Sequence, residues 1–250
     1  MKIMITSILL AIAVSSVAQE KKGHKKFDKE KMESYMPSIT RTLGGSIQQF
    51  NGLNNRLAGL PQYKPLKDYT ATLGLGWMME RNRFISGGSI TIGSSLSAHR
   101  DEKSSTIRYI GFNADMGYDL LKSEKITLYP LAGLGYQAYQ AIFYSDNTLV
   151  DFDDVLESPA VQNSIRSTRF RNDFLLYRAG AGIAFNSPEH AGSIGLQAGY
   201  TGSFQKHGWR SNEGQTLGNA PKDGISQFYF SLILTSKPWM MKKMMEKHHM

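Results

Sequence analysis

Four ionisable residues fall on the small, polar side of stretches in which side chains alternate in character: Glu80, Asp115, Asp119 and Arg178. Carboxylates beside a guanidinium can build a satisfied polar core, or they can form a path for protons or small solutes. Because an unpaired charge in an interior is costly, we expect Arg178 to pair with Asp115 or Glu80. A structural polar core is the favoured interpretation, and the solute path is the alternative.

A second set of ionisable residues lies in a predicted loop over 145–173. Asp151, Asp153 and Asp154 supply oxygen ligands of the kind that Ca²⁺ prefers, but the loop lacks the spacing and the glycine of an EF-hand. We therefore expect a solvated loop without metal. The same loop also carries three arginines that can contact phosphates of lipopolysaccharide or pair with these acids: Arg166, Arg169 and Arg171.

Residues 237–250 combine methionines with His248 and His249. Thioethers and imidazoles suit copper. Methionines and Trp239 beside lysines equally suit an amphipathic helix at the inner-leaflet interface. We favour an interfacial or disordered tail and predict no metal site.

A hydrolase on this scaffold needs a histidine near a serine or near a pair of acids. A histidine lies close in sequence to serines at two places, His99 near Ser104 and Ser105, and His207 near Ser203 and Ser211. Serine is so common in this chain that this nearness carries little information. The sequence predicts no enzyme and no cofactor.

The elements that position these side chains follow a period of two, which is typical of strands with two unlike faces. In residues 69–80 the odd positions are apolar or aromatic, and the even ones are mostly small or polar. Eight such strands are predicted, at 39–50, 69–80, 84–98, 106–119, 126–144, 174–186, 191–204 and 225–236.

The gaps between these strands alternate between long or medium and short. Up-and-down barrels of outer membranes have short periplasmic turns at one end and longer loops at the other. The predicted fold is therefore an all-β, antiparallel, up-and-down eight-stranded transmembrane β-barrel, with both termini at the short-turn end. Side chains fill a barrel of this size, so no open pore is expected.

The distribution of lysine separates a membrane barrel from a soluble one. Between Ile39 and Ser236 every lysine falls in a predicted loop or turn, at 64, 67, 103, 122, 125, 206 and 222. Lysine in the middle of a lipid-facing wall costs ~2–4 kcal/mol, whereas a soluble barrel or sandwich carries lysine on its outer face. The pattern favours lipid outside and a polar lumen inside, with polar lumen residues at Gln48, Glu80, Asn113, Asp115, Asp119, Gln137, Arg178 and Gln197.

Residues 52–60 are expected to form a short amphipathic helical turn, with Leu53, Leu57 and Leu60 on one side. Such a segment can cap the mouth of the barrel or contribute to a small apolar ligand site. A packed loop helix without a ligand is the favoured interpretation.

The segments at the two ends of the chain have compositions of their own. Residues 1–18 have the charged start, apolar core and small-x-small ending of a signal peptide. They are followed by a basic periplasmic lead-in at 19–38, the barrel at 39–236 and a Met/Lys/His-rich tail at 237–250.

The lead-in and the tail carry most of the net charge of +8. Because the chain has a predicted signal peptide, nucleic acid is not expected as a partner. The chain has no cysteine, which excludes a disulfide scaffold and a thiolate metal site.

These features resemble the small outer-membrane β-barrel proteins of Gram-negative bacteria. The sequence Phe50-Asn-Gly-Leu-Asn54 is similar to the Phe-x-Gly-Leu-Asn first loop of one group of them. The resemblance implies a non-enzymatic, monomeric barrel with a structural or surface-binding role. Its implied partners are outer-membrane lipids, lipopolysaccharide and the barrel-insertion machinery. A carrier for small hydrophobic solutes is the alternative, and a lipid-modifying hydrolase comes third. Such barrels commonly end on an aromatic residue of the last strand, whereas this chain continues to Met250.

Overall fold

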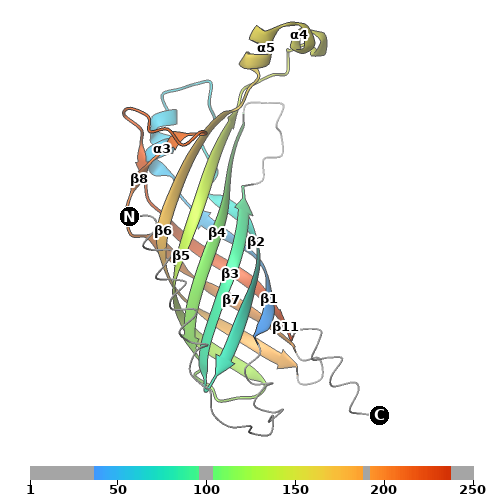
Figure 1. The fold of residues 1–250 in the computed structure, drawn as a ribbon, viewed down its shortest axis with the longest axis vertical. Helices are drawn as coiled ribbons and strands as arrows, with labels where there is room; N and C mark the ends of the chain where they lie inside the picture. Colours follow the sequence, from blue (N-terminus) through green and yellow to red (C-terminus); the bar gives the residue numbers. More distant parts are fainter. Residues whose placement is uncertain (1–36, 96–103, 188–191, 238–250) are drawn as a thin grey trace, which may run out of the picture. The chain divides into compact units, whose positions relative to one another are not determined.

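The structure, a computed structural model, describes residues 37–95, 104–187 and 192–237. Within these residues, eight long strands form one closed antiparallel barrel (Figure 1). The strands are β1 (Ser38–Gln48), β2 (Tyr69–Arg81), β3 (Phe84–Ser94), β4 (Ser104–Tyr118), β5 (Ile126–Tyr144), β6 (Thr168–Ser187), β7 (Gly192–Ser203) and β11 (Ser226–Ser236).

Each strand pairs with its neighbours in the chain, and β11 returns to pair with β1, which closes the sheet. The barrel is thus an up-and-down meander, and the predicted fold class is confirmed. We call the end with the connections β2–β3, β4–β5 and β6–β7 the short-turn end. The opposite end, with the other connections, is the long-loop end. The start of β1 and the end of β11 both lie at the short-turn end.

Local sequence chemistry sets the turns at the short-turn end. Asn82 and Arg83 join β2 to β3 with φ angles of 50° and 70°. A two-residue hairpin turn whose twist matches that of the strands requires positive φ at both residues. In the β4–β5 turn, Asp119 Oδ1 accepts hydrogen bonds from the backbone N–H groups of Leu121 and Leu128, both at 3.2 Å. Arg83 Nε donates to the carbonyl oxygen of Asp119 at 2.9 Å, which ties the two turns together.

The prediction for the sixth strand is wrong at its start, because β6 begins at Thr168 rather than at 174. Arg169 and Arg171 therefore lie in a strand and not in a loop. Their side chains are exposed and alternate with Phe170, which is half-buried, and with Asn172, which is buried. The strand pattern continues there with charged residues on the outward face, whereas the prediction required that face to be uncharged.

Shorter elements occupy the long-loop end, where β4, β5 and β6 extend beyond the other strands (Figure 1). They are α3 (Asn51–Leu57), α4 (Phe152–Glu157), α5 (Pro159–Ser164), β8 (His207–Gly208), β9 (Arg210–Ser211) and β10 (Lys222–Asp223). Helices α4 and α5 lie between β5 and β6 in the chain and bury no residue. Strand β8 pairs with β10, and β9 pairs with the upper part of β6.

Two segments, 50–66 and 207–225, pack together at the long-loop end, and we call them the plug. Its apolar side chains contact the inward faces of β4, β5 and β6. Phe50 lies edge-on to Tyr139 and to Trp209, with ring centroids 5.4 and 5.6 Å apart. The buried residues of this cluster are Phe50, Leu53, Leu57, Leu66, Ile107, Tyr109, Tyr139, Ala141, Phe143, Phe174, Leu176, Trp209 and Ile225.

Several predictions concern residues that the structure does not describe. The signal peptide at 1–18, most of the basic lead-in at 19–38, and the tail beyond Lys237 lie outside the described residues. His99 also lies outside them. Among the described residues, no helix is long and apolar enough to cross a membrane.

Candidate functional site

An ion pair lies in the lumen of the barrel. Arg178 on β6 donates from NH1 to Asp115 Oδ2 on β4 at 2.5 Å, and the two side chains are 10% and 23% exposed. The guanidinium carbon also lies 4.9 Å from the centroid of the Tyr229 ring on β11. The pair is neutral as a unit, and its position is consistent with a polar core that holds three strands together.

Uncharged polar side chains surround this pair. The Tyr139 hydroxyl lies 2.7 Å from Gln137 Oε1 and 2.9 Å from Gln48 Oε1, and Thr72 and Tyr109 share a 3.0 Å hydrogen bond. Among the described residues, several buried polar atoms of the lumen have no protein partner: Gln48 Nε2, Asn113 Oδ1, Asp115 Oδ1, Gln227 Oε1 and Tyr229 OH.

The lumen contains a cavity of about 110 Å³. Since one water needs about 10–15 Å³ of such space, several waters fit and can bond the polar atoms that lack a protein partner. Toward the short-turn end the lining becomes apolar, with Met78, Ile85, Tyr129, Leu131 and Ile233. The cavity is smaller than the ~300–1,000 Å³ typical of sites for drug-sized ligands.

The four ionisable residues singled out from the sequence divide into two groups. Asp115 and Arg178 face the cavity together. Glu80 and Asp119 lie instead at the rim of the short-turn end, because their strands end there. Glu80 is exposed, and Asp119 is buried against the backbone of its own turn. Of the other predicted lumen residues, Asn113, Gln137 and Gln197 line the cavity.

Asp223 holds the plug over the lumen. Its carboxylate accepts hydrogen bonds from the backbone N–H of Gly52 at 2.7 Å, from that of Leu53 at 2.9 Å, and from Trp209 Nε1 at 2.7 Å. Leu53 and Leu57 are buried in the plug, whereas Leu60 follows the end of α3 and is 38% exposed. The predicted amphipathic turn therefore packs with two of its three leucines.

The outward face of the barrel wall is apolar and exposed. Every strand of the barrel contributes large apolar side chains that are between 41% and 66% exposed: Ile39, Leu43, Ile47, Leu73, Leu75, Ile90, Ile92, Ile110, Phe112, Met116, Leu134, Leu175, Ile194, Leu196, Phe228, Phe230 and Leu234. We call this surface the apolar band. Aromatic residues border it toward the short-turn end, at Trp77, Phe84, Tyr118 and Phe185, and toward the long-loop end, at Tyr69, Tyr136, Tyr177, Tyr200 and Phe204.

Beyond the band, at the long-loop end, the pairing of strands brings arginines together. Arg108 on β4 pairs with Gln140 on β5, Gln140 pairs with Arg171 on β6, and Arg171 pairs with Arg210 on β9. We call these four residues the arginine row. Sequence reasoning placed Arg171 near acids of its own loop and missed Arg108 and Arg210. It lacked β9, which is two residues long, and β9 sets Arg210 beside Arg171.

The remaining candidates have simpler surroundings. Among the described residues, no group of three or more metal-binding side chains occurs, at Asp151, Asp153 and Asp154 or elsewhere. His207 Nδ1 lies 2.7 Å from the carbonyl oxygen of Asp173, and its ring stacks on Phe174. The hydroxyls of Ser203 and Ser211 accept hydrogen bonds from backbone N–H groups.

The fold and the lumen together define a closed, up-and-down β-barrel of the small eight-stranded class, with a plug at one end.

No protein-family model matches the chain, and a search of curated proteins finds no match. Solved structures do resemble it. The attachment invasion locus protein Ail of Yersinia pestis is 17% identical with a TM-score of 0.44, over 80% of this chain and 95% of Ail. Neisserial surface protein A is 9% identical with a TM-score of 0.42, over 82% and 97% of the two chains. A major outer membrane protein of Thermus thermophilus is 10% identical with a TM-score of 0.43, over 80% and 99%.

Proposed function

We propose that this protein is an integral outer-membrane barrel without catalytic activity, which acts in a structural or surface-binding role through its long-loop end. The observation that carries the proposal is the apolar band. Soluble monomers rarely expose a contiguous apolar patch larger than a few hundred Å². Here large apolar side chains are exposed on every strand around the wall.

The backbone and the composition of the wall support a lipid environment. Closure of β11 onto β1 leaves no unpaired edge in the wall, which is the condition for strands to stand in hydrocarbon. None of the described strands of the barrel contains a lysine, and aromatic side chains border the band on both sides. Short turns in the periplasm and long loops outside are the usual orientation of such barrels. The long-loop end is then the outer surface.

The plug supports a binding role over a conducting one. It fills the long-loop end with apolar side chains and lies above the lumen. The alternative, a carrier of small hydrophobic solutes, draws on the apolar lining of the cavity near the short-turn end. It is less well supported because the cavity is small and because the ion pair and uncharged polar groups line its other part.

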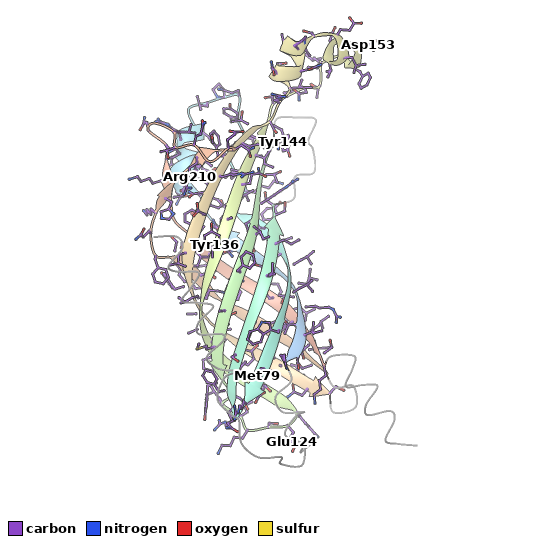
Figure 2. The ribbon with its side chains drawn as sticks, viewed as in Figure 1. Met79, Glu124, Tyr136, Tyr144, Asp153 and Arg210 are labelled. Carbon is purple, nitrogen blue, oxygen red and sulfur yellow. The ribbon has the colours of Figure 1, made fainter. Side chains whose placement is uncertain are left out.

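The orientation can be tested with single cysteines, because the native chain has none. Asp153 at the tip between β5 and β6 and Glu124 in the β4–β5 turn are both exposed and lie at opposite ends (Figure 2). In intact cells, a membrane-impermeant maleimide is expected to label Asp153→Cys but not Glu124→Cys. After lysis both are expected to react.

The same cells provide a test of location. The proposal requires the protein in the outer-membrane fraction, with a folded band whose electrophoretic mobility changes on boiling. A soluble periplasmic protein with unchanged mobility, or labelling of Glu124→Cys alone in intact cells, would contradict it.

A further inference from the structure

We infer that the arginine row binds the phosphate groups of a phosphorylated glycolipid, lipopolysaccharide, in the outer leaflet. This inference rests on the proposed function and names a partner for the long-loop end. Its basis is the position of the row on the outward face, where a lipid that surrounds the barrel can reach it.

The register sets the spacing of the row. Arg108, Gln140, Arg171 and Arg210 are consecutive cross-strand partners. Since neighbouring strands lie about 4.8 Å apart, the two outermost arginines are separated by roughly 15 Å at the backbone. Guanidinium groups bind phosphate oxygens in a bidentate manner, and three of them over this span suit a headgroup with several anionic groups.

The height of the row fits the phosphate level of a membrane. Arg108 lies two residues beyond Ile110 on β4, and Arg171 lies four residues beyond Leu175 on β6. Ile110 and Leu175 belong to the apolar band. Along β6 the side chains therefore pass from apolar band to charge within about 14 Å of strand. In Figure 2, Arg210 lies farther toward the long-loop end than Tyr136, which borders the band.

Neighbouring groups hold Arg210 and Gln140 in place and leave the row basic. Arg210 NH2 pairs with Asp173 Oδ1 at 2.7 Å, and Gln140 Nε2 donates to Asn212 Oδ1 at 3.0 Å, which anchors β9 to the wall. Arg169 lies two residues from Arg171 on the same face. Glu213 is the other acid near the row; hydrogen bonding with its own backbone lowers its pKa, and the charge of Arg171 lowers it further. The three arginines of the row and Arg169 thus carry four positive charges, against the two negative charges of Asp173 and Glu213.

The test uses the full chain folded in detergent and titrated with lipopolysaccharide. The variant Arg108→Gln/Arg171→Gln is expected to bind at least about tenfold more weakly, because the loss of even one charge-assisted hydrogen bond to a phosphate costs about a factor of ten. Arg41→Gln is the matched control. It removes one of the same guanidinium charges, where the double variant removes two, from the outward face near the short-turn end; there Arg41 NH1 lies 3.5 Å from Ser236 Oγ. Its affinity is expected to stay within about twofold of the native value.

Two competitors distinguish the sources of phosphate. Inorganic phosphate and phosphatidylglycerol vesicles, at equal phosphate concentration, are expected to displace little of the bound glycolipid. Equal competition by either would overturn the assignment to a glycolipid. Unchanged affinity of the double variant, with its heat-dependent mobility intact, would overturn the role of the row. Loss of heat-dependent mobility in the native protein would instead contradict the proposed function.

Discussion

At the scale of single residues, the ion pair between Arg178 and Asp115 is the one salt bridge of the lumen among the described residues. Asp115 Oδ1 has no protein partner among the described residues, so Asp115 depends on Arg178 for its charge compensation. The alternating pattern of the sequence predicted this pairing, since Arg178 is the one cation that it placed on the polar face of a strand.

We predict that Arg178→Leu lowers the free energy of unfolding by about 3 kcal/mol, because it leaves the Asp115 carboxylate without its partner. Urea unfolding of the detergent-folded protein measures this. The double variant Arg178→Leu/Asp115→Leu is expected to recover much of the loss. Unchanged stability of the single variant would contradict a structural role for the pair.

Asp223 has a comparable role in the plug, where one carboxylate accepts three hydrogen bonds. We predict that Asp223→Ala loosens the plug at a local cost of about 2 kcal/mol while the barrel remains closed. In a background where Trp77 and Trp239 are replaced by Phe, the emission of Trp209 is expected to shift to the red and to become accessible to acrylamide. Mobility before boiling is the control, and it should stay that of the folded barrel.

At the scale of elements, alternation located every strand of the barrel, and for β5 it gave both ends, Ile126 and Tyr144. It succeeded because one face is apolar over most of its length, so a shift of one residue would reverse both faces. It failed at the start of β6, where the outward face becomes charged. It also missed β8, β9 and β10, since two-residue strands depend on tertiary pairing and leave no periodic signal.

The residues of the candidate site, like the strands, were only partly predictable from the alternation of side chains. Asp115 and Arg178 were found because their strands are regular. Glu80 and Asp119 were placed in the lumen because alternation gives the face of a residue but not its height along the strand. The arginine row needed the register between β4, β5, β6 and β9, which the sequence does not contain.

The tip formed by α4 and α5 is expected to be dispensable for folding. Neither helix buries a residue, and Leu149, Phe152 and Leu156 are strongly exposed. We predict that replacing residues 149–165 by a short Gly/Ser linker changes the free energy of unfolding by less than about 0.5 kcal/mol. Urea unfolding tests this, and a large loss would mean that the tip packs on the barrel.

At the scale of the whole molecule, the orientation and the role proposed for the barrel both require that the apolar band meets lipid. A closed sheet with an apolar outer wall and a polar lumen suits that environment. If water met the wall, exposed side chains such as Leu73 would tolerate charge at little cost.

The most direct measurement compares Leu73→Arg with Leu149→Arg in protein folded into lipid vesicles. Leu73 is 55% exposed between Tyr69 and Trp77 on β2, and Leu149 is 99% exposed at the tip. If the wall faces lipid, Leu73→Arg lowers the free energy of unfolding by ~2–4 kcal/mol. Leu149→Arg, which faces water, is expected to change it by less than about 0.5 kcal/mol. Equal, small effects of the two substitutions would contradict a lipid-facing wall.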